Sequence, residues 1–203
     1  MGGSLLLRPT SSLTPSLKRT LTTSFLNEYF HADAAHLLSN TSSYLPRSAI
    51  LNRNALALAT FLENHRLTSP QNSPITSVLY PPFTPTHQNY VSVMRPPTKD
   101  FTPGYGCLLS VQFPTIRIAR AFYDHLSVYH GPHLGAHHTL AFPFNDAIWG
   151  ADPEAAAYLA SFGVGPEQVR VSVGLEEEEE LIDTFKEALR WAEEEMAKEA
   201  KGE

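Results

Sequence analysis

Arg170 is the residue of this sequence whose type and setting point most directly to chemistry. It stands in the run 168–173, where valines alternate with polar residues, so a β-strand there places the valines on one face and Arg170 on the other. A planar guanidinium binds a carboxylate through two parallel hydrogen bonds. The pattern leaves two partners open, a substrate carboxylate or an acid of the fold in a structural salt bridge, and by itself it favours the salt bridge.

Four histidines lie within a stretch of nine residues: His130, His133, His137 and His138. Their spacing does not match a compact zinc site, and no cysteine joins them. Neighbouring residues on a strand also face opposite ways, which separates His137 from His138. We therefore expect a histidine-rich loop that lines a cleft, with a histidine-based metal site as the less favoured alternative.

Composition narrows the classes of partner. The 203 residues are 42% apolar and 18% charged, enough for a sizeable core in one or two domains. A net charge of -6 provides no basic field for nucleic acid, and no apolar run approaches the length of a membrane span. Cys107, the single cysteine, cannot form an internal disulfide, which suits a reducing compartment such as the cytoplasm.

The first 65 residues are predicted to be mostly helical. Residues 3–7 are an apolar run that predicts a short strand, and the basic, acid-free composition of residues 1–27 is also typical of a mitochondrial transit peptide. Apolar residues recur at helical spacing over 32–62, with Asp33 expected as an N-cap. Pro46 predicts a break, followed by a longer helix that ends near residue 65.

Strand-like and helical runs alternate after residue 66. The patterns predict strands at 75–80, 106–113, 139–144 and 168–173, and helices at 116–129, 153–162 and 177–200. This alternation indicates an α/β or α+β domain in which helices cover a mixed sheet. The glutamates at 176–180 are expected to form the start of the last helix and not a cation site. Adjacent helical residues point in different directions, so they cannot bind one cation together.

Four segments carry motifs that occur together in one enzyme family: Met1-Gly2-Gly3-Ser4-Leu5-Leu6, Tyr44-Leu45-Pro46-Arg47 with Arg53-Asn54-Ala55, Gly104-Tyr105-Gly106-Cys107-Leu108-Leu109-Ser110, and Val169-Arg170-Val171-Ser172-Val173-Gly174-Leu175-Glu176. In this order they resemble the glycine-rich strand after the cofactor lysine, the interdomain helix, a small-domain strand and the closing motif of the Cys/Met-metabolism pyridoxal-phosphate (PLP) enzymes. Among these, the chain resembles fungal proteins similar to cystathionine γ-synthase.

The resemblance implies roles for three residues. Arg170 matches the arginine that binds the α-carboxylate of the amino-acid substrate, so this reading now overtakes the salt bridge. Thr139 takes the place of a serine that assists it, and His138 falls where a residue that selects the substrate side chain stands. The family's cofactor lysine, pyridine acid and phosphate cup lie upstream of the first segment, so no catalytic, cofactor-binding or metal-binding residue is expected in this chain.

The resemblance also implies an organisation and a function. Residues 1–65 would be the remnant of a large PLP-binding domain with the interdomain helix, Met1 an internal methionine, and 66–203 the substrate domain of a fold-type-I transferase. The complete enzyme would replace the γ-substituent of an activated homoserine with cysteine or another thiol. The chain alone would be inactive or nearly so and would not hold PLP. It would be either a truncated gene product or one half of an enzyme whose PLP domain is separately encoded, with a homo-oligomer as another expected assembly. The alternative is a non-catalytic regulatory or binding module that associates with full-length relatives.

Overall fold

The computed structural model describes residues 5–202 and divides the chain into two compact units, Met1–Tyr44 and Leu45–Glu203. Within the described residues, no helix is both long and apolar enough to cross a lipid bilayer. The large-domain boundary expected after residue 65 stays a prediction, but the helix expected to end there belongs almost entirely to the second unit. The hydrophobic core that the structure describes also lies in the second unit.

The first unit contains two helices, α1 (Thr14–Ser24) and α2 (His31–Thr41). The expectation that Asp33 caps α2 is wrong, because α2 begins two residues earlier and Asp33 lies in its first turn, where its charge still favours the helix. The strand predicted at 3–7 is also wrong where it is described: residues 5–8 are irregular, and every described strand pairing lies after residue 76. The start of that predicted strand lies outside the described residues.

Residues 5–44 are expected to be the first region cut by a protease. Thr14 is their only buried residue, while Leu6, Phe25 and Leu38 are among their exposed large apolar side chains. A segment without buried contacts opens at little cost in free energy, so brief trypsin or chymotrypsin digestion should cut here and leave a stable product of residues 45–203. Cleavage confined to the tail after residue 197, read by mass spectrometry, would contradict this expectation.

Helix α3 (Tyr44–Thr68) supplies one side of the core of the second unit. The long helix predicted there is confirmed, but the break precedes Pro46 instead of falling on it. The chain turns at residues 42–43, and Pro46 sits in the first turn of α3, where a helix needs no amide donor. The buried side of α3 consists of Asn54, Ala55, Leu58, Ala59 and Leu62.

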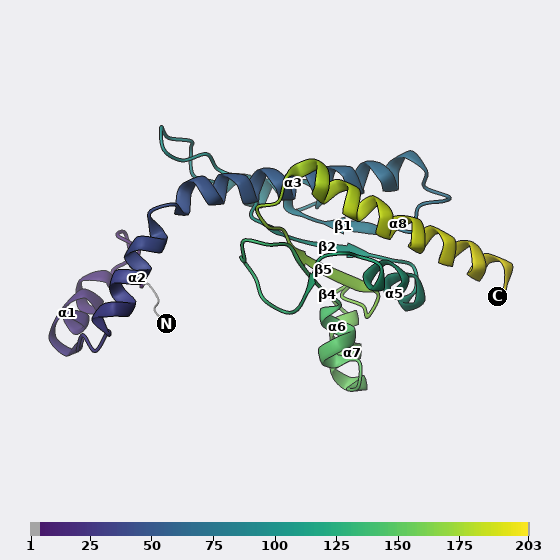
Figure 1. Cartoon of the computed structure of the whole chain (residues 1–203). Coiled ribbons are helices and arrows are strands. Elements are labelled where there is room, and N and C mark those ends of the chain that lie inside the picture. The colour runs from purple at the N-terminus through teal and green to yellow at the C-terminus, as the bar shows by residue number, and fades with distance from the viewer. Residues whose placement is uncertain (1–4, 203) are drawn as a thin grey trace. The chain divides into compact units, whose positions relative to one another are not determined.

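A five-stranded sheet in the order β1-β2-β5-β4-β3 forms the centre of the second unit (Figure 1). All neighbouring strands are antiparallel except β3 and β4, which are parallel, so the predicted mixed sheet is confirmed. The four predicted strands are present and shorter than expected. The strands are β1 (Ser77–Leu79), β2 (Leu108–Gln112), β3 (Tyr129–His130), β4 (Leu140–Phe142) and β5 (Gln168–Ser172).

The helix predicted at 116–129 ends early because the chain there joins the sheet. Helix α5 stops at Asp124, and Tyr129 of β3 pairs with Leu140 of β4. Strand pairing thus overrides the local helical pattern. Three short helices were not predicted: η1, α4 and α6. The helical segments after α3 are η1 (Pro81–Phe83), α4 (His87–Val93), α5 (Ile116–Asp124), α6 (Phe144–Trp149), α7 (Pro153–Ala160) and α8 (Glu178–Lys201).

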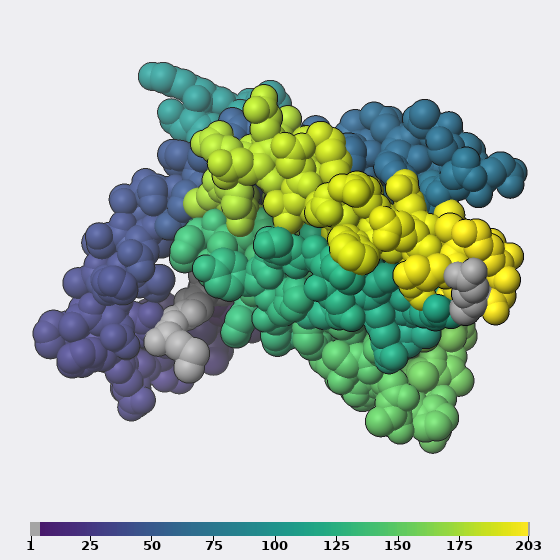
Figure 2. Space-filling model, turned by 45° about the vertical axis from the view of Figure 1, so that its right-hand side comes forward, coloured from purple at the N-terminus to yellow at the C-terminus, as the bar shows by residue number. Residues whose placement is uncertain are grey.

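Helices α3, α5 and α8 cover one face of the sheet. In Figure 1, α3 and α8 lie on the same side of it, and Figure 2 shows α8, in yellow-green to yellow, against the teal α5. The stripe predicted for the last helix is buried and joins the residues of α3 and the valines of β5 in one hydrophobic core. This packing fixes β5, so that Arg170 is presented from a rigid element.

Candidate substrate-binding site

The sheet has one packed face and one partly open face, as the alternation in β5 predicts. Val169 and Val171 are fully buried, whereas Arg170 between them is half-buried on the other face. Strand pairing places Ser110 of β2 and Phe142 of β4 directly beside Arg170. The three residues form one row across the sheet, with Arg170 as its charged member.

Arg170 has contacts with a carbonyl and with an aromatic ring. Its Nη2 donates a hydrogen bond to the Pro132 carbonyl oxygen at 3.0 Å, and its Cζ lies 4.5 Å from the centre of the Phe144 ring. Partial burial lowers the pKa of the guanidinium, which stays charged at neutral pH. Among the described residues it forms no ion pair with an acid. The structural salt bridge considered for Arg170 is therefore absent from the part of the chain that the structure describes.

Thr139 is 1% exposed, and both hydrogen-bonding capacities of its hydroxyl are in use. The hydroxyl donates to Glu176 Oε2 at 2.8 Å and accepts from the Gly174 amide at 2.9 Å, while the Thr139 amide donates to Glu176 Oε1. A Cβ on Gly174 would come within 2.5 Å of the His138 carbonyl carbon, so only glycine allows this approach. These contacts join the end of β5 to the histidine-rich loop.

Two asparagines of α3 form hydrogen bonds with the backbone around Gly174 and Gly106. Asn54 is fully buried, and its Nδ2 donates to the carbonyl oxygens of Gly174 at 3.2 Å and Glu176 at 2.7 Å. Asn52 Oδ1 accepts from the Gly106 amide at 2.8 Å. Sequence reasoning recognised the Asn54-Ala55 pair as a motif but assigned no role to Asn54, and it placed Glu176 at the start of the last helix, which begins only at Glu178. A buried asparagine on an otherwise apolar helix face is the signal that could have identified Asn54.

The histidine-rich loop is connected by hydrogen bonds to β5 and to the segment after it, and the cleft expected beside this loop stays a prediction. The Gly135 amide donates to Ser172 Oγ at 3.0 Å, and the Leu175 amide donates to the His137 carbonyl oxygen at 2.9 Å. The half-buried His138 ring lies 4.2 Å from the Tyr129 ring. Among the described residues, no three histidine, cysteine or acidic side chains lie close enough to hold a metal ion.

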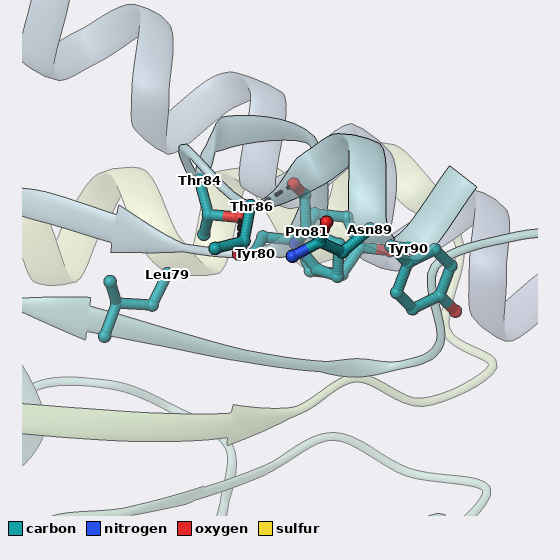
Figure 3. A pocket seen from close by; sticks show the side chains of 7 residues that line it. All are labelled: Leu79, Tyr80, Pro81, Thr84, Thr86, Asn89 and Tyr90. Atoms are coloured by element: carbon teal, nitrogen blue, oxygen red, sulfur yellow. Dashed lines mark hydrogen bonds between the residues drawn. The ribbon is translucent and has the colours of Figure 1, made fainter. Parts of the chain in front are cut away.

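A groove of about 640 Å³ lies between the end of β1, η1 and α4 (Figure 3). Tyr80 and Tyr90 donate hydrogen bonds from its wall to the carbonyl oxygens of Gly106 and Gly104, at 2.8 and 3.0 Å. Burial raises the pKa of Tyr80, which keeps its phenol protonated. None of the described residues that line this groove is charged, so they offer a carboxylate no counter-charge. The lining residues are Leu79, Tyr80, Pro81, Thr84, Thr86, Asn89 and Tyr90.

Residues 32–190 match the sequence model of the Cys/Met metabolism PLP-dependent enzymes. This range includes α3, the five strands and the closing motif with Arg170 and Glu176. The chain belongs to this family.

Relatives place the chain within the family. It is 35% identical to a cystathionine gamma-synthase-like protein of Aspergillus thermomutatus, over 94% of this chain and 31% of that protein. It is 31% identical to the cystathionine gamma-synthase of Neurospora crassa, over 96% of this chain and 29% of that protein. The chain thus spans about a third of the length of the relatives it matches. The fungal cystathionine γ-synthase-like resemblance of the sequence is confirmed.

Solved structures of the family have the same fold. The chain superimposes with a TM-score of 0.59 on the cystathionine gamma synthase of Xanthomonas oryzae in complex with cystathionine, at 23% identity, over 75% of this chain and 36% of that one. The cystathionine gamma-lyase of Lactobacillus plantarum, complexed with L-serine, gives the same TM-score at 22% identity. At this identity the match establishes the fold only, and the predicted fold class is confirmed.

The family uses PLP, and the lysines of this chain do not fit a site for it. A lysine that forms a Schiff base with PLP needs an enclosing, desolvated pocket to become a nucleophile at neutral pH. All five lysines are exposed, and Lys186 and Lys198 pair with Asp183 and Glu195 along the surface of α8. No described pocket is lined by a lysine. The five lysines of the chain therefore lie on the surface, outside the described pockets.

Proposed function

We propose that this chain is the substrate-domain portion of a PLP-dependent enzyme similar to cystathionine γ-synthase. In its complete form, such an enzyme would replace the γ-substituent of an activated homoserine with cysteine or another thiol. The observation that supports this proposal most strongly is the environment of Arg170. Its charged guanidinium belongs to the family's closing motif, lies on a packed strand and has no acidic partner among the described residues. A cation placed in this way suits a carboxylate that arrives with the substrate.

The proposal gives each predicted site residue a different task. Arg170 holds the α-carboxylate of the amino acid. His138 borders the position of the substrate side chain, where its ring packs on Tyr129. The predicted contact of Thr139 with substrate stays a prediction. Its hydroxyl donates to Glu176 and accepts from Gly174, which supports first a positioning role that keeps the loop with His138 attached to the end of the strand with Arg170.

The proposal includes inactivity of the isolated chain. Five exposed lysines without an enclosing pocket supply neither a Schiff base nor a proton shuttle, so the chain needs a partner half that brings both. A separately encoded PLP domain would provide both, whereas a homo-oligomer carries the same exposed lysines and would add neither. A cytoplasmic location is part of the proposal. The chain has a single cysteine and forms no internal disulfide, which is compatible with a reducing compartment.

A chimeric enzyme tests this function. The segment of Neurospora crassa cystathionine gamma-synthase that aligns with this chain is replaced by this chain, which leaves the fungal enzyme's own cofactor half intact. The chimera is expected to bind PLP and to form a thioether product from an activated homoserine and cysteine. The isolated chain, treated with PLP and borohydride, is expected to give no adduct on a single lysine. A chimera that folds and binds PLP without turnover above background would overturn the proposal.

A second candidate function is supported by the first unit. Its exposed large apolar side chains include Leu6, which is 91% exposed, Phe25 and Leu38, and exposed apolar side chains of this kind favour a protein–protein contact. A non-catalytic module that associates with full-length relatives would cover them. Co-purification with such a relative that is lost when residues 1–44 are removed, together with an inactive chimera, would favour this candidate.

A further inference from the structure

The guanidinium of Arg170 is held from two directions by elements other than its own strand. The Phe144 ring of α6 covers one face at 4.5 Å, and the Pro132 carbonyl oxygen of the histidine-rich loop accepts from Nη2 at 3.0 Å. The ring confines the guanidinium on one side, and the carbonyl fixes the position of Nη2. An arginine side chain that is otherwise flexible thus has one defined orientation.

Phe144 does not depend on Arg170 for its own position. The next residue, Asn145, is 5% exposed, and its Nδ2 donates to the Gly165 carbonyl oxygen at 3.0 Å. One residue further, Asp146 pairs with Arg120 of α5 at 3.1 Å. These contacts attach α6 to the body of the unit, so its first residue supplies a fixed aromatic surface.

The same contacts leave donors for a ligand. A guanidinium has five N–H donors, arranged as two forks of parallel N–H pairs that share Nη2. The Pro132 carbonyl occupies one proton of Nη2, which interrupts one fork and leaves the other complete. A carboxylate can therefore still bind through two parallel hydrogen bonds while the stack on Phe144 stays in place.

We propose that Phe144 is a positioning residue for substrate binding: its ring orders the Arg170 guanidinium before a carboxylate arrives. This inference rests on the proposed function, because it takes Arg170 as the carboxylate ligand. Arginine loses much of its rotamer freedom when it binds a ligand, and a side chain ordered in advance avoids that loss. Removal of the ring is expected to weaken carboxylate binding roughly three- to thirtyfold, the range that cation–π contacts support.

Side-chain NMR of the full chain, with ¹⁵N-labelled arginine, measures both halves of this inference. The Arg170 Nε–Hε signal is assigned by its loss in Arg170→Lys. In the wild-type chain it is expected to be sharp and shifted by the ring current of Phe144, and to move on titration with L-homoserine at millimolar concentration. L-homoserine amide, which lacks the carboxylate, is expected to leave it unmoved.

Three variants separate positioning from general stability. Phe144→Leu should broaden the Arg170 signal, remove its ring-current shift and raise the Kd for L-homoserine, whereas Phe144→Tyr should retain all three. Phe162→Leu, which removes an exposed ring at the end of α7, is the matched control and should change nothing at Arg170. A role confined to packing would lower the melting temperature of Phe144→Leu without a change in the Arg170 signal or Kd.

The outcomes distinguish this inference from the proposed function. If the wild-type Arg170 signal does not respond to L-homoserine, the carboxylate role and the positioning role are both overturned. If it responds, and Phe144→Leu responds with the same Kd, the carboxylate role stands and the positioning role is overturned. A raised Kd in Phe144→Leu with rescue by Phe144→Tyr supports both.

Discussion

Replacing Asn54 with alanine is expected to lower the free energy of unfolding by about 2 to 4 kcal/mol. Asn54 is fully buried, and its amide supplies hydrogen bonds to the carbonyl oxygens of Gly174 and Glu176. Alanine removes both donors and leaves two acceptors and a small cavity in the interior. In a unit of this size the melting temperature should fall by roughly 5 to 15 °C, which circular dichroism or calorimetry on the full chain measures.

Asn52 provides the matched control on the same helix. It accepts one hydrogen bond, from the Gly106 amide, at a partly exposed position where water can replace it. Asn52→Ala is therefore expected to cost only about 1 kcal/mol. Equal and small losses for the two variants would show that water compensates the carbonyls beside Asn54 as well, and that α3 does not hold the Gly174 turn.

The elements that the sequence predicted well carry their signal locally. The run at 106–113 identified β2, whose residues alternate between a packed and a partly open face. The valine alternation at 168–173 identified β5, in which only Arg170 is half-buried. The last helix was equally clear, since glutamates at its start, a buried stripe and lysines at its end all agree. Where several local preferences coincide, tertiary contacts only confirm them.

The wrong predictions concern segments whose structure depends on partners. Asp33 has the residue type of an N-cap, but α2 begins two residues earlier. The apolar run at residues 5–7 resembles a strand, yet a strand requires a neighbour, and none of the described pairings reaches this segment. Tyr129 lies in a segment with a helical sequence pattern, but it forms a strand because it pairs with β4.

The sequence points to Arg170 as a candidate site residue, but it does not reveal the residues that contact Arg170 in the structure. The closing motif identified Arg170 from the sequence, but the residues that orient it come from segments 26 to 38 residues away, Phe144 and Pro132. Thr139 was expected to face the substrate, and the structure shows it bonded to Glu176, 37 residues later. Contacts between distant segments produce no periodic pattern in a sequence. The sequence can therefore suggest the chemistry of a side chain, but not the residues that the side chain contacts.

The largest functional effect is expected from Arg170→Lys in the chimeric enzyme. Lysine keeps the positive charge but loses the planar fork, so it cannot bind a carboxylate through two parallel hydrogen bonds. A partly desolvated pair of this kind contributes on the order of 2 to 4 kcal/mol, and kcat/KM for the amino-acid substrate should therefore fall roughly thirty- to a thousandfold. Steady-state kinetics of wild-type and variant chimeras give this ratio directly.

The melting temperature of the same variant decides between binding and support. Arg170 lies on the partly open face, has no acidic partner among the described residues, and is flanked by Val169 and Val171, which carry the packing. Arg170→Lys is therefore expected to change the free energy of unfolding by less than about 1 kcal/mol. Arg190→Lys, at an exposed ion pair of α8, is the control that should alter neither quantity. A clear loss of stability with unchanged kinetics would make Arg170 a structural residue and would remove the observation on which the proposed function depends.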